Sequence, residues 1–145
     1  MIYTDENRGT IQFRERRKQL VDFSSLRIGK ITPTDCDGLI EYHGKAYILF
    51  EIKYRDAKVP EGQLKALTRM IDALNHASKY AVLIIAEHNV DNPAEDINAA
   101  DCKVRSWYDG RKQGCFNGTL KELVDICIAR VDGKEYIKTY EGNRR

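Results

Sequence analysis

The sequence lacks a long hydrophobic run, and this absence excludes several classes of protein. Its longest apolar stretch, Tyr80 to Ala86, has only seven residues, whereas a transmembrane helix needs about 20. The first residues contain no apolar segment of signal-peptide length. We therefore expect a chain that does not span a membrane, is not secreted and stays in the cytoplasm.

Cysteine and histidine are too few and too scattered to suggest a zinc site. The four cysteines show no C-x-x-C spacing and the three histidines lie far apart, whereas structural zinc sites usually show such spacing. We expect reduced thiols in a reducing cytoplasm. The three prolines fall where connections between elements are expected, and no repeat or linker is present. The 145 residues are therefore interpreted as a single domain, 1–145.

Net charge is close to balance at +2, but basic residues are concentrated near the start of the chain. Positions 8 to 30 contain seven basic residues and two acidic ones. Such an excess suits a polyanion, although on its own it is better explained by a solvated helix face. The candidate DNA-binding residues are Arg14, Arg16, Arg17 and Lys18.

The spacing of apolar residues predicts alternating helices and strands. The predicted elements are a helix over 12–25, strands over 26–31, 37–43 and 46–54 with a turn at 43–45, a helix from 59 to about 77, a buried strand over 80–86, a loop over 89–100, a strand over 103–108 and a helix beginning at Thr119. This order predicts an α/β fold, in which helices pack on a mixed sheet.

The strongest predicted strand ends in Glu51-Ile52-Lys53. An acid-x-lysine triplet occurs four times in the sequence, so the triplet alone carries little weight. Only this copy ends a strong apolar strand, where alternation places Glu51 and Lys53 on one face. Charges at partly buried positions are costly unless they are paired or bound to a metal. A structural ion pair at the strand end is the alternative explanation.

Antiparallel pairing of the strands over 37–43 and 46–54 would bring Asp37 opposite this triplet. The carboxylates of Asp37 and Glu51 and the Ile52 backbone carbonyl then form an oxygen site suited to Mg²⁺, with Mn²⁺ as a substitute. Such a metal holds a phosphate and lowers the pKa of a bound water, and Lys53 would orient that water or stabilise the phosphorus centre. The pattern predicts a phosphodiester hydrolase. An ordinary turn residue in Asp-Gly is the alternative for Asp37.

Three segments together, Thr34-Asp35-Cys36-Asp37-Gly38, Glu51-Ile52-Lys53 and Gly62-Gln63, resemble the PD-(D/E)xK nuclease superfamily. The chain is most similar to small phage- and prophage-type members, and its pattern is related to Holliday junction resolvases and RecB-type nuclease domains. The resemblance implies a restriction-endonuclease-like αβββαβ core over about 12–88, a mixed sheet flanked by helices, and a C-terminal elaboration over 89–145. It also implies Mg²⁺/Mn²⁺-dependent DNA hydrolysis, in recombination or repair, inside a bacterial or phage-infected cell.

The resemblance assigns roles to four residues as catalytic candidates. Asp37 matches the first metal-binding acid, Glu51 the second and Lys53 the motif lysine. Gln63 matches a glutamine that several branches carry at the start of the next helix, and an exposed helix residue explains it equally well. The first half-motif lacks a Pro-Asp pair, so Asp35 is a rival to Asp37, which we prefer because it directly starts the strand.

A further metal ligand is implied on the first helix, where some branches carry an acid that Glu15 matches. A partner within the same helix, such as Lys18, explains Glu15 as well. The main alternative to a nuclease is a module of the same fold that holds DNA or a protein partner without cutting. A junction resolvase would need a symmetric homodimer, and no sequence signal identifies a dimer face.

Overall fold

The computed structural model describes residues 21–133. The chain divides into two compact units, Met1–Pro33 and Thr34–Arg145. No helix within residues 21–133 is both long enough and apolar enough to cross a membrane. The interpretation of the chain as one domain stays a prediction.

The described part of the first unit has little regular structure. Ser24–Leu26 forms a 3-10 helix, η3, and the Asp22 carboxylate accepts the Ser24 N–H at 2.9 Å, a local turn that competes with an α-helix. Gly29 has a φ of +59° and turns the chain back. Ile28 and Ile31 therefore form only an isolated β-bridge. The predicted strand over 26–31 is therefore wrong, as is the predicted helix over 21–25. The helix over 12–20 lies outside the described residues.

The second unit is built on a five-stranded sheet in the order β1-β2-β3-β4-β5. The strands are β1 (Gly38–Tyr42), β2 (Ala46–Tyr54), β3 (Tyr80–His88), β4 (Lys103–Tyr108) and β5 (Gln113–Gly114). Strands β2 and β3 are parallel, and the other neighbours are antiparallel. The predicted α/β class with a mixed sheet is confirmed, together with four of its strands, whereas β5 was not predicted.

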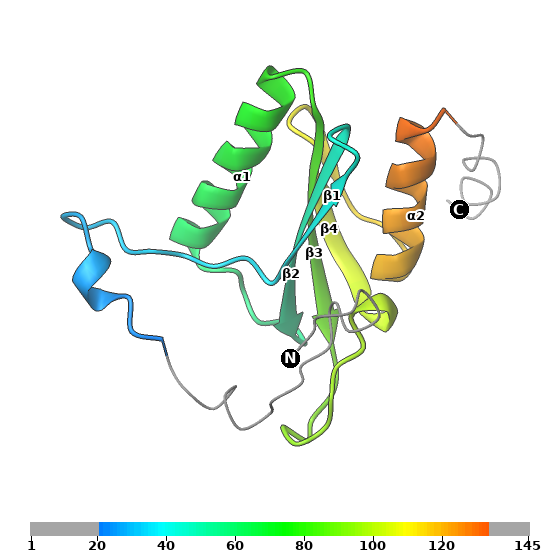
Figure 1. The fold of residues 1–145 in the computed structure, drawn as a ribbon. Helices are drawn as coiled ribbons and strands as arrows, with labels where there is room; N and C mark the ends of the chain where they lie inside the picture. The colour runs from blue at the N-terminus through cyan, green and yellow to red at the C-terminus, as the bar shows by residue number, and fades with distance from the viewer. Residues whose placement is uncertain (1–20, 134–145) are drawn as a thin grey trace, which may run out of the picture. The chain divides into compact units, whose positions relative to one another are not determined.

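Two helices cover the two faces of this sheet, α1 in green and α2 in orange (Figure 1). Helix α1 (Glu61–His76) connects the parallel strands β2 and β3 and packs Leu67 against one face. Helix α2 (Leu120–Val131) packs Leu123 against the other. Thr119 begins α2 with the predicted capping box. Both predicted helices of this unit are therefore confirmed.

The hairpin of β1 and β2 positions the candidate site. Three residues, 43–45, connect the paired Tyr42 and Ala46. His43 and Gly44 both have positive φ, 51° and 66°, and the Lys45 N–H donates to the Tyr42 carbonyl at 2.9 Å, as in a tight hairpin turn. The last pair of the hairpin joins Gly38 to Phe50. Asp37 therefore lies just beyond the paired part of β1, beside the end of β2, as the sequence predicts.

Strand β2 shows the predicted alternation between its two faces. Ile48 belongs to the core under α2, and Leu49 belongs to the core under α1. Glu51 continues the α1 face and is only 2% exposed. The strand thus carries a buried carboxylate toward the end where α1 begins.

Candidate hydrolytic site

Glu51 is the centre of the candidate site. Its Oε1 lies 2.9 Å from the Lys53 Nζ and accepts a hydrogen bond of 2.8 Å from the Gln63 Nε2. Its Oε2 accepts the Asp37 N–H at 3.3 Å. A buried carboxylate is unfavourable unless such partners compensate for its lost hydration. These three neighbours therefore compensate for the lost hydration of the buried Glu51 carboxylate.

The Asp37 side chain takes the place of a backbone partner for β2 just beyond the last pair of the hairpin. Its Oδ2 accepts the Ile52 N–H at 2.6 Å, where β1 no longer supplies a backbone partner. A strand residue directs its N–H and C=O to the same edge, so the Ile52 carbonyl lies on the Asp37 side of β2. Partial burial raises the pKa of Asp37; the Ile52 N–H works against this rise, and the nearby Glu51 charge adds to it.

Gln63 brings Asp35 into the same cluster. The Gln63 Nε2 lies 3.1 Å from the Asp35 backbone oxygen and 3.3 Å from its Oδ1, and the Gln63 Oε1 lies 3.5 Å from the Lys53 Nζ. Gln63 is only 7% exposed, so the alternative of an ordinary exposed helix residue is wrong. Because both Asp35 and Asp37 reach the cluster, the preference for Asp37 as the first metal ligand stays a prediction.

The oxygen atoms gathered here are of the kind that Mg²⁺ and Mn²⁺ prefer. They come from the carboxylates of Asp37 and Glu51 and the Ile52 carbonyl. Asp35 joins this cluster through its contacts with Gln63. Within residues 21–133, no group of three or more His, Cys, Asp or Glu side chains is arranged to hold a metal ion. Since Mg²⁺ usually keeps several waters and is bound through one or two carboxylates, the donor set fits a site of that kind.

Several predicted residues lie outside the part of the chain that the structure describes. They are Glu15, Arg14, Arg16, Arg17 and Lys18. The role of Glu15 in metal binding and of the four basic residues in DNA binding therefore stay predictions.

Arg105 was not predicted, yet it ties together the elements around the site. It falls at an irregularity in the pairing of β3 with β4. Its guanidinium donates to the Ala57 carbonyl at 2.7 Å and to the Arg55 carbonyl, and it lies 3.5 Å from the Glu87 carboxylate. These contacts hold the connection between β2 and α1, which separates Lys53 from Gln63. No local sequence signal reveals such a contact, because it depends on strand pairing.

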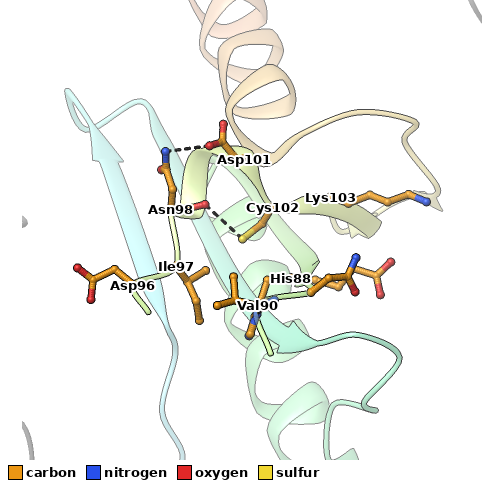
Figure 2. A pocket seen from close by; sticks show the side chains of 10 residues that line it. His88, Val90, Asp96, Ile97, Asn98, Asp101, Cys102 and Lys103 are labelled. Carbon is orange, nitrogen blue, oxygen red and sulfur yellow. Dashed lines mark hydrogen bonds between the residues drawn. The ribbon is translucent and has the colours of Figure 1, made fainter. Parts of the chain in front are cut away.

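A hollow of about 340 Å³ lies beyond the end of β3 (Figure 2). The 3-10 helix η4 (Ala99–Asp101) forms part of it, and Asp101 accepts a hydrogen bond of 3.0 Å from Asn98. The side chains of Asp96 and Asp101 point to different sides of the hollow (Figure 2). The carboxylates of Asp96 and Asp101 do not converge, so this hollow is not a second candidate for a metal site.

Comparison of the chain with protein-family models, with curated proteins and with solved structures finds no match. The sheet and its two helices establish an α/β class, and a fold class does not by itself define an activity. The function must therefore be inferred from the chemistry of the site.

Proposed function

We propose that this protein is a metal-dependent nuclease that hydrolyses DNA phosphodiester bonds. The observation that carries the proposal is the contact of the buried Glu51 carboxylate with the Asp37 backbone N–H, the Lys53 ammonium and the Gln63 amide. A buried charge held beside a second carboxylate and an ammonium is a costly arrangement, and such arrangements concentrate at functional sites.

The order of elements supports a restriction-endonuclease-like core. Strands β1 and β2 form a hairpin, and α1 leads to β3, which is parallel to β2. This order agrees with the last four elements, ββαβ, of the αβββαβ pattern that the sequence resemblance implies. We infer that residues 38–88 supply these four elements, while residues 26–31 do not form the first strand of the pattern.

The residues of the cluster divide the chemistry between them. Asp37, Glu51 and the Ile52 carbonyl would hold Mg²⁺ or Mn²⁺. When bound, the metal neutralises charge on the phosphate and lowers the pKa of a coordinated water. Lys53, with a side chain 22% exposed, is open to solvent and would donate to a phosphoryl oxygen or orient the water. Gln63 holds the Glu51 carboxylate in place through its amide.

Cleavage of a panel of labelled DNAs tests this proposal. The panel contains supercoiled plasmid, linear duplex, circular single strand and a four-way junction, each with Mg²⁺, Mn²⁺ or EDTA. We expect metal-dependent cleavage, and a loss of about 100-fold or more in Lys53→Ala. The variant is assayed at a temperature where circular dichroism shows it folded, because it leaves Glu51 without its ammonium partner. Unchanged cleavage by folded Lys53→Ala would contradict the proposal.

A second candidate is a module of the same fold that binds DNA or a protein partner without cutting. It is favoured by the lack of a three-side-chain metal group within residues 21–133. Titration with Mg²⁺ or Mn²⁺ in a thermal-shift assay separates the two candidates. A hydrolytic site should be stabilised by metal and should lose this response in Asp37→Asn. If the four-way junction is the preferred substrate, we also expect a symmetric homodimer.

A further inference from the structure

A groove on the α1 face of the sheet extends away from the candidate site. It encloses about 620 Å³, which is within the range of roughly 300–1,000 Å³ that is typical of small-molecule sites. One wall is formed by Leu64, Thr68 and Asp72, which follow one another at helical spacing along α1. The floor is formed by Leu83 and Ile85 of β3, and the second wall by β4 and β5.

Strand register places this groove next to the Glu51 cluster. Ile85 on its floor pairs with Glu51, and neighbouring strands lie only about 4.8 Å apart. Leu64 on its wall directly follows Gln63 in the sequence. At the opposite end, the Tyr108 hydroxyl donates to the Asp72 carboxylate at 2.6 Å and ties the two walls together. A ligand in the groove would therefore lie within one strand of the hydrolytic carboxylate.

The groove combines apolar and polar surfaces in the way that a nucleobase requires. A base has two apolar faces and a polar edge. Leu64, which is 40% exposed, supplies apolar surface at the open side, and the nearly buried Leu83 and Ile85 close the floor. Ser106 and Gln113 on the second wall supply a hydroxyl and an amide for the edge.

Exposed basic residues lie next to the lining residues of both walls of the groove. Lys65 and Arg69 are exposed neighbours of the lining residues on α1, and Arg111 and Lys112 are exposed in the turn before β5. The carboxylate of Asp72, which lines the groove, is engaged by a tyrosine hydroxyl. Positive charge around an apolar base site is the combination by which proteins hold single-stranded nucleic acid.

We propose that this groove binds an unpaired nucleobase of the DNA strand whose backbone lies at the Asp37–Glu51–Lys53 cluster. The placement of the backbone rests on the proposed nuclease function, whereas the base site itself does not require cleavage. The proposal predicts that substrates with an unpaired nucleotide next to the scissile phosphate are preferred over fully paired duplex.

Cys115 offers a direct test, because it lines the groove and is exposed. Cys102 and Cys127 are buried and Cys36 is half-buried, so Cys115 should react first with a small maleimide. Its alkylation is followed by mass spectrometry in EDTA, with a single-stranded oligothymidylate or with an abasic oligonucleotide of the same length. At ten times the dissociation constant, the thymidylate should slow alkylation on the order of tenfold, and the abasic strand should not.

Two variants that fill the groove serve as tests from opposite walls. Thr68→Phe and Ser106→Phe should each abolish the base-dependent protection of Cys115, while the matched Thr68→Ala, which leaves the space open, should retain it. Equal protection by both oligonucleotides, or protection by neither, would overturn the proposal. Cleavage of DNA without base-dependent protection would leave the nuclease standing and remove the base site. Base-dependent protection without cleavage of any DNA would support the base site and contradict the nuclease function.

Discussion

Replacement of Lys53 by methionine should destabilise the fold because it leaves the Glu51 carboxylate buried without its ammonium. The two charged atoms are 2.9 Å apart, and the side chains are 22% and 3% exposed. Removal of one partner from a buried ion pair typically costs about 3–5 kcal/mol. Since Lys53 is partly solvated and Glu51 keeps two other donors, we expect a loss of about 2–3 kcal/mol. The melting temperature should fall by on the order of 10 °C.

The double variant Glu51→Gln/Lys53→Met should recover most of this stability. Both charges are removed together, and a neutral replacement of a buried pair is often close to neutral in stability, here within about 1 kcal/mol of the wild type. Neither variant should cleave DNA. Unfolding by urea in EDTA, followed by circular dichroism, gives the free energies, and the cleavage assay is run on the same preparations.

The chain offers a matched control in the exposed pair of Lys121 and Asp125. These side chains are 62% and 44% exposed, so Lys121→Met should cost less than about 0.5 kcal/mol. If Lys53→Met is as mild as this control, Glu51 is not the desolvated charge described above. If the double variant cleaves DNA normally, the pair takes no part in catalysis.

Two further variants test single contacts. Burial raises the pKa of Asp37 above its usual value of 3.8, so ionisation of this carboxyl destabilises the folded state. Without metal, the free energy of unfolding of the wild type should therefore fall as the pH rises from about 3.8 through the raised pKa of Asp37. Asp37→Asn should flatten this fall and be the more stable protein at pH 7. Lower stability of Asp37→Asn at pH 7 in EDTA would mean that its bond to the Ile52 N–H dominates. Thr119→Ala removes the capping box of α2 and should cost about 1 kcal/mol in urea unfolding, whereas Glu122→Gln keeps a side-chain acceptor for the Thr119 N–H and should cost less.

The centre of the molecule could be predicted because its signals are local. The apolar alternation of β2 fixes which face carries Glu51, and the tight turn at His43 and Gly44 fixes the hairpin register. Together they bring Asp37 beside Glu51 without any knowledge of the rest of the chain. The capping box at Thr119 is likewise a local pattern, and it marks the start of α2.

The sequence-based predictions are wrong or incomplete in two situations. In one, the backbone conformation overrides the local hydrophobic pattern, and in the other, the structure depends on pairing between residues far apart in the sequence. The apolar residues over 26–31 suggest a strand, but the left-handed Gly29 turns the segment on itself. The two-residue β5 exists only because it pairs with the end of β4. Asp35 could not be separated from Asp37 by sequence, because the contact that draws Asp35 in comes from Gln63 on another element. Arg105 was missed for the same reason, since its partners lie across the sheet.

The central claim is that the Glu51 carboxylate is required for DNA hydrolysis, and one comparison of rates tests it most directly. Glu51→Gln and Glu87→Gln remove the same charge from neighbouring strands at the same end of the sheet, where Glu87 pairs with Lys53. Single-turnover cleavage with Mg²⁺ is measured for both folded variants. The account predicts a loss of about 100-fold or more for Glu51→Gln and a change within about threefold for Glu87→Gln. Wild-type cleavage by Glu51→Gln, or an equal loss in both variants, would contradict it.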